Sequence, residues 1–146
     1  MADQKCFKIN DSEGNCLAVV IRSGFSPERT TFFSENSYSQ QIGIIKYPRG
    51  GTITAHYHNL VPREVVYTQE VLVIRRGRVR VNLFNKKLEA VSSTILNEGD
   101  MVHLISGGHG FEMLDDTEML EVKQGPYSGV SQDKTTFGGS HHDTSK

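Results

Sequence analysis

His56 and His58 form an H-x-H pair, the first pattern in the chain whose residue types suit a binding site. They end the stretch TITAHYH (52–58), which is predicted to be a β-strand because it is short, rich in β-branched residues and preceded by a turn signal. Side chains two residues apart on a strand share a face, so both imidazoles should converge as nitrogen ligands. The pair alone also fits buried or surface histidines that hydrogen-bond to backbone groups.

A carboxylate and a third imidazole are predicted to reach the same place. Glu70 has the parity of Leu72 and Ile74 in the next apolar stretch, so it should point inward with them. His109 is in phase with Phe111 in a later stretch. Three imidazoles and one carboxylate with open coordination positions suit a divalent transition metal, namely Fe, Mn, Ni, Co, Cu or Zn. Neutral imidazole and ionised carboxylate are the binding forms, so metal affinity should fall as pH drops through the histidine range.

Short apolar stretches separated by turn signals predict the strands that must position these residues. They lie at 16–21, 41–47, 52–58, 70–76, 78–84, 101–105, 110–114 and 118–123. This many short strands in one small domain predict an all-β fold, closed or nearly closed as a sandwich or barrel, since closure removes exposed edges. Helix should be a minor component, with room for a short turn at 58–69 and 128–137.

The stretch RVRVNLF gives the clearest strand pattern. Val79, Val81 and Leu83 alternate with polar residues, which predicts one face toward a core and one toward solvent. Gly77 is expected to form the tight connection before this strand, and Gly99 in NEGD is placed to supply a positive φ before a later one.

The chain has 146 residues, a mass of 16.3 kDa and a formal net charge of -1. This length predicts one domain. Interleaved acidic and basic residues give no basic footprint for nucleic acid and no polybasic patch for a membrane, which favours small-molecule chemistry. The polar start MADQKCFKIN is unlike a signal peptide, so the expected compartment is the cytoplasm. Cys6 and Cys16 are predicted to be free thiols, because two cysteines make no disulfide framework.

Two stretches resemble the motifs of the cupin superfamily. GTITAHYH followed by EVLVIRRG resembles the first motif, and GDMVHLISGGHGF resembles the second. The resemblance covers about residues 40 to 125. It implies a cupin-type β-barrel (a double-stranded β-helix or jelly roll) with little helix and a metal in its mouth. The positions that match the family's ligands are His56, His58, Glu70 and His109.

The chain departs from the family's pattern at two ligands. The segment NLVPREVVYTQ between His58 and Glu70 is longer than in the family, so Glu64 is a rival carboxylate at a more usual distance. Glu70 is preferred because its spacing to Gly77 and the strand that follows it fit the motif. The turn that carries His109 is shorter than the family's turn.

The resemblance also divides the single domain into parts. Residues 1–39 would hold N-terminal strands and a dimerisation hairpin around SEGN, because small cupins often pair through their N-terminal strands. Residues 40–127 would form the barrel core, and 128–146 a polar C-terminal tail that is partly disordered. A homodimer is therefore implied.

The long insertion between the ligand strands supplies candidates for contact with a substrate. Glu64 or Tyr57 would assist proton transfer if either faces the site. Arg63 and Tyr67 lie where a loop would cap the barrel mouth, and Arg63 would pair with a carboxylate or phosphate there.

The remaining candidates are lining residues and histidines outside the motifs. Phe111 and Met113 are expected to line the barrel, a surface that can also be the wall of a substrate pocket. His103 has the opposite parity to its neighbours, which favours an outward, structural role. His141 and His142 lie in the polar tail and are not assigned to the site.

The first functional hypothesis is an enzyme, a mononuclear metal cupin that acts on a small polar metabolite through a Lewis-acidic metal. Sugar isomerases and epimerases, including those of surface-polysaccharide synthesis, are favoured because the small single-domain format resembles the sugar-acting members. An Fe(II)-dependent dioxygenase is an alternative, and it would consume oxygen where an isomerase would work anaerobically. A non-catalytic module that binds a small ligand is the alternative from another class.

Overall fold

The computed structural model describes residues 4–138, and in them the chain is nearly all β. The strands are β1 (Cys6–Asn10), β2 (Cys16–Ile21), β3 (Thr31–Phe32), β4 (Gly43–Ile44), β5 (Glu70–Arg76), β6 (Val79–Phe84), β7 (Ala90–Leu96), β8 (Met101–Leu104), β9 (Gly108–Met113) and β10 (Glu118–Lys123). One short helix, α1 (Val130–Asp133), follows within the 128–137 segment where a turn of helix was predicted.

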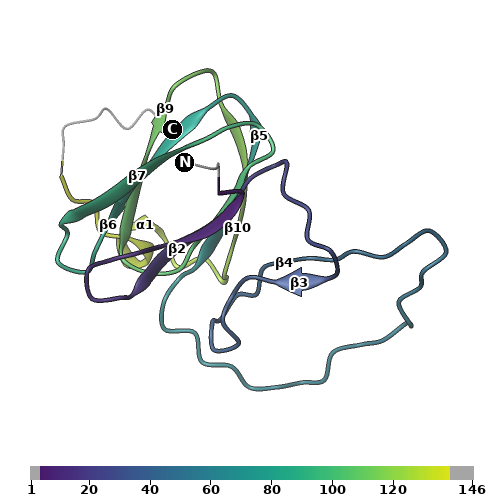
Figure 1. Ribbon diagram of the computed structural model, residues 1–146. Helices are drawn as coiled ribbons and strands as arrows, with labels where there is room; N and C mark the ends of the chain where they lie inside the picture. Colours follow the sequence, from purple (N-terminus) through teal and green to yellow (C-terminus); the bar gives the residue numbers. More distant parts are fainter. Residues whose placement is uncertain (1–3, 139–146) are drawn as a thin grey trace.

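The strands form three antiparallel sheets (Figure 1). The five-stranded sheet has the order β1-β2-β8-β5-β10, the three-stranded sheet has the order β7-β6-β9, and β3 pairs only with β4. The hairpin predicted around SEGN is present as β1 and β2, and β2 lies inside the five-stranded sheet. The all-β prediction is confirmed, but the sheets do not close into a barrel, because β9 and β10 each pair on one side only among the described residues.

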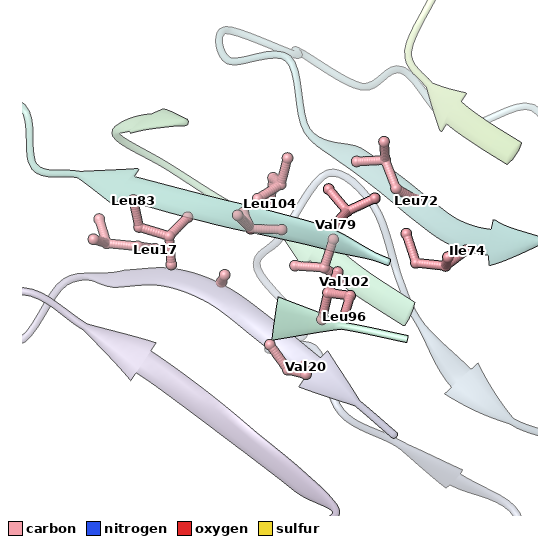
Figure 2. Close-up of a cluster of buried hydrophobic side chains, with 11 residues drawn as sticks. Leu17, Val20, Leu72, Ile74, Val79, Leu83, Leu96, Val102 and Leu104 are labelled. Carbon is pink, nitrogen blue, oxygen red and sulfur yellow. The ribbon is translucent and has the colours of Figure 1, made fainter. Parts of the chain in front are cut away.

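The core lies between the five-stranded and three-stranded sheets. Figure 2 shows side chains from both sheets pointing toward one another, among them Leu17, Leu72 and Leu83. The alternation predicted for β6 is confirmed, since Val79, Val81 and Leu83 are buried there while the residues between them are partly exposed. Burial of these apolar side chains is the main favourable term in the folding free energy.

A second apolar cluster covers the opposite face of the five-stranded sheet. Val19 and Ile21 of β2 pack there against Ile42, with Phe25 and Phe33 around them. The segment between β2 and β4 therefore forms an outer layer on this sheet. Because β2 is buried on both faces, it is a continuous apolar run rather than an alternating one.

Two glycines predicted to form turns have the backbone conformation that requires them. Gly77 has φ 83° and Gly99 has φ 81°. At Gly77 a Cβ would also lie 2.4 Å from the carbonyl oxygen of Asp116, so no other residue fits without a shift of the chain.

A buried ion pair fastens the end of β2 to the turn before β8. Arg22 Nη1 lies 2.7 Å from Asp100 Oδ2, and the Asp100 side chain is 3% exposed. The same carboxylate accepts hydrogen bonds from the backbone N–H groups of Ser23 and Asn97. These donors compensate for the removal of the carboxylate from water.

Most predicted strands are present, with bounds that move by one or two residues. Those at 16–21, 70–76, 78–84, 101–105, 110–114 and 118–123 correspond to β2, β5, β6, β8, β9 and β10. The strand predicted at 41–47 shrinks to β4, and β7 was not predicted because its half-exposed centre is Ser-Ser-Thr.

The predicted strand at 52–58 is wrong, since this stretch has no regular structure. It belongs to residues 48–68, here named the histidine arm, all of which are exposed. In Figure 1 the histidine arm runs out from the sheets on the side of β3 and β4. Alternating sequence is a local signal, whereas a strand also needs a neighbouring backbone to pair with. The short turn of helix for which residues 58–69 had room is absent too, because this stretch also lacks a neighbouring segment to pack against.

The first half of the predicted tail contacts the three-stranded sheet. Phe137 packs against Phe84 with ring centroids 5.1 Å apart, and its ring lies beside Gly108. Residues 139–146, with His141 and His142, lie outside the described residues. Among residues 4–138, no helix is long and apolar enough to cross a membrane.

Candidate functional site

Glu70 and His109 meet at the seam between the two large sheets. His109 Nε2 lies 3.1 Å from Glu70 Oε2, and their side chains are 30% and 16% exposed. Glu70 begins β5 and has the inward parity of buried Leu72, as predicted. His109 lies on β9 opposite buried Leu83 of β6, so it also faces inward. Strand parity therefore brings together two residues that lie far apart in the sequence.

The surroundings of Glu70 keep it ionised. The hydrogen bond from His109 is the largest cause that lowers the pKa of the Glu70 carboxyl, and the charges of Lys123 and Lys134 lower it further against the effect of burial. The interactions that lower this pKa also stabilise the folded chain. Their contribution to the free energy of unfolding is present above the carboxyl's ordinary pKa and is lost as pH falls through the lowered pKa. At neutral pH Glu70 is therefore a carboxylate, the form that binds a metal or a cation.

His56 and His58 lie near each other in the histidine arm. Their ring centroids are 5.4 Å apart, and His56 Nδ1 donates a hydrogen bond to the Thr54 carbonyl oxygen at 2.9 Å. Both side chains are exposed. Residues 4–138 contain no cluster of three or more potential metal ligands. Within one chain, Glu70 and His109 therefore lie together, but the imidazoles of His56 and His58 do not lie with them.

The candidates of the long insertion are exposed with it. Tyr57 is 86% exposed, and Arg63 and Glu64 also lie at the surface of the histidine arm. Tyr67 is exposed too, but the Lys86 ammonium lies over its ring at 5.5 Å from the centroid. The end of the histidine arm thus returns beside the β6–β7 turn.

One of the two lining candidates adjoins the contact between Glu70 and His109. Phe111 packs against the core, and its ring centroid lies 5.5 Å from that of His109. Met113, at the end of β9, is 50% exposed. Phe111 is therefore the lining residue that forms a wall beside His109.

His103 has the outward parity that was predicted, yet it is fully buried by the outer layer. Its Nε2 lies 3.3 Å from Gln69 Oε1, and the Tyr38 ring is 6.5 Å away. Burial lowers the pKa of His103 to about 4, so the ring is neutral near pH 7. Its role is structural, on the opposite face of the sheet from Leu72.

Two lysines at this site were not singled out in the sequence. Lys123 is the register partner of Glu70 across β10 and β5, and its ammonium lies 3.3 Å from Asp133 of α1. The charge of Lys134 also acts on Glu70, so the tail contributes to the site. Register between strands distant in sequence carries no local signal, and this is why Lys123 was missed.

Two surface hollows lie away from the Glu70 and His109 pair. One is lined by Arg76, Asp116, Thr117 and Glu118. The other is lined by Lys5, Arg22, Ser23, Gly24, Asn97 and Asp100. The charged lining of the first hollow is explained by the ion pair between Arg76 and Asp116, and that of the second by the buried contact between Arg22 and Asp100.

Comparison of the chain with models of protein families, with curated proteins and with solved structures found no match.

Proposed function

We propose that the protein is a divalent-metal-binding cupin that acts on a small polar metabolite, with Glu70 and His109 as two of the metal ligands. The observation that carries this proposal is the 3.1 Å contact between a carboxylate oxygen and an imidazole nitrogen facing inward from two sheets. Carboxylate and imidazole together are ligands that Zn, Fe, Mn and related metals accept.

The geometry of the pair fits two ligands of one metal. Atoms that each bind a metal at about 2.0–2.2 Å on neighbouring coordination positions lie roughly 3 Å apart, the separation found here. Glu70 is ionised, and a metal would take the place of the proton that His109 now donates. Two donors are fewer than the three or more protein ligands of most such centres, so His56 and His58 are the proposed remaining ligands.

The side chains around the pair favour a small ligand rich in oxygen atoms. When bound, the metal would polarise a carbonyl or hydroxyl oxygen of that ligand. Lys134 adds positive charge that acts on Glu70, which favours an anionic or polar group, and the Phe111 ring offers an apolar wall. We favour a sugar isomerase or epimerase within this class, on the resemblance of the single-domain format.

A non-catalytic binding module is the second candidate, and a specific observation favours it. Glu64 and Tyr57, the proposed proton-transfer residues, are exposed in the histidine arm rather than placed against the pair. A site that binds a metal and a ligand without such a group would retain affinity without turnover.

Elemental analysis of the protein purified without an affinity tag tests the proposal. Glu70→Gln and His109→Ala should each lose most of the bound metal, whereas Glu64→Gln is the matched control and should keep it. Wild-type stoichiometry in both site variants would overturn the metal centre. Oxygen uptake by the Fe(II)-loaded protein with candidate substrates would favour a dioxygenase, and anaerobic turnover of a sugar with Mn, Zn or Co would favour the isomerase.

A further inference from the structure

The histidine arm carries exposed apolar side chains, and among the described residues its stretch 52–58 pairs with no other strand. Ile53, Leu60 and Val66 are 58%, 102% and 74% exposed, and Tyr57 is more exposed than Ile53. Between residues 52 and 68 no backbone group hydrogen-bonds to the backbone of another element in residues 4–138. Contiguous exposed apolar residues on a soluble protein mark a surface that binds something.

A matching acceptor exists at β9. This strand pairs with β6 on one side, and its other side has no backbone partner among the described residues. Phe137 packs beside Gly108 at the start of the strand. An unpaired strand edge is a template for another extended segment.

The stretch 52–58 has the pattern that such an edge accepts. Its period of two places Thr54, His56 and His58 on one face. If that face continues the inward face of β9, both imidazoles lie on the same side as His109 and near the Glu70 carboxylate. Imidazole nitrogens and a carboxylate can bind the same metal ion, or a protonated imidazole can donate a hydrogen bond to the carboxylate.

The direction of the histidine arm indicates that the acceptor edge belongs to another molecule. In Figure 1 the first part of the arm extends away from the sheets beyond β3 and β4, on the opposite side of the molecule from β9, before its last part returns toward β5. The histidine arm has about 21 residues, and one side of a stable protein interface has about 20–30. An exchange of two arms about a two-fold axis would therefore supply enough contact for a dimer.

We propose that two copies of this chain exchange their histidine arms, so that residues 52–58 of each copy add a strand to the β9 edge of the other. Each metal centre then takes Glu70 and His109 from one copy and His56 and His58 from the second. The shared ligand set rests on the proposed function, whereas the exchange itself does not depend on a metal. This dimer differs from pairing through the N-terminal hairpin.

Complementation between two inactive chains tests the shared site. One chain carries His56→Ala and His58→Ala, and the other carries Glu70→Gln and His109→Ala. Each alone should bind no Co²⁺ at the wild-type affinity, whereas chains refolded together should recover about a quarter of the wild-type sites, one in each mixed dimer. No recovery from the mixture, with Co²⁺ bound by the wild type, would overturn the exchange of ligands between copies.

Sedimentation tests the exchange without a metal. The wild type should be a dimer in the presence of a chelator. The double variant Thr54→Pro, Ala55→Pro should be a monomer, because one of two successive N–H groups on an added strand faces the new ladder and proline cannot donate it. The matched control Thr54→Val, Ala55→Val should remain a dimer, because valine keeps both N–H groups and favours a strand. A monomeric wild type, or a dimer of the double proline variant, would overturn the exchange. A dimer that binds no Co²⁺ would support the exchange and overturn the proposed metal function.

Discussion

The buried imidazole of His103 should make the protein lose stability in mild acid. Burial lowers its pKa from the ordinary value of 6.5 to about 4. The unfolded chain therefore binds a proton on this residue at a higher pH than the folded chain does, and acid favours unfolding. The contribution is complete above the ordinary pKa, and the free energy of unfolding should fall by about 2 kcal/mol by about pH 5 and about 3 kcal/mol by about pH 4.

Urea unfolding of His103→Leu would isolate this term. Gln69 keeps its hydrogen bond with the Gln40 backbone N–H when the imidazole is removed, so the variant should still fold. Other carboxylates lose stability in acid in both proteins, and the informative quantity is the difference between wild type and variant at each pH. That difference should shift in favour of the variant by about 2 kcal/mol between neutral pH and about pH 5.

The matched control is Val19→Ala, at the position on β2 that pairs with His103. This substitution removes buried packing on the same face of the sheet but no titratable group. It should therefore change the free energy of unfolding by the same amount at every pH. A wild-type minus His103→Leu difference that stays flat from neutral pH to about pH 4 would refute the reasoning, because it would mean that His103 is hydrated or charged in the native state.

Three further outcomes are expected. Asp100→Ala should lower the free energy of unfolding by about 3 kcal/mol, because it leaves the Arg22 charge and two backbone N–H groups without their partner. Chemical denaturation with an unchanged m-value measures this loss, and a loss well under about 1 kcal/mol would contradict the prediction. Gly14→Ala should lower the free energy of unfolding by about 1–2 kcal/mol, because Gly14 has a positive φ. Gly77→Ala should lower it by more, because Gly77 also has a positive φ and a backbone oxygen lies where its Cβ would be. Equal melting temperatures of the two variants would contradict this. Co²⁺ affinity of the proposed metal centre should drop as pH falls below about 6.5, and titration calorimetry that gives a pH-independent affinity would exclude imidazole ligands.

Strand parity predicted the part of the site that lies on strands. Glu70 was assigned to the inward face from the alternation of its stretch, and His109 from its phase with Phe111, and the structure places them in contact. Both assignments depend on neighbours within a few residues, which a single sequence contains. The alternation of Val79 and Val81 in β6 was predicted for the same reason.

Pairing between distant segments could not be predicted in this way. The stretch that holds His56 and His58 has a strand pattern, but strand formation also depends on an available edge. The strand β7 is the opposite case. Its sequence has a weak strand pattern, but it forms a strand because it pairs with β6 along its length. The register that sets Lys123 opposite Glu70 is likewise a property of the assembled sheet.

The outer layer gives the two large sheets unequal surroundings. The central strands β2 and β8 of the five-stranded sheet are enclosed on both faces, whereas the outward face of the three-stranded sheet carries exposed ion pairs such as the one between Arg80 and Glu112. Glu70 lies on β5 beside the enclosed strand β8, and His109 lies on β9 at an edge of the other sheet. A metal ion bound as proposed would therefore link the enclosed sheet to an edge strand of the sheet that faces water.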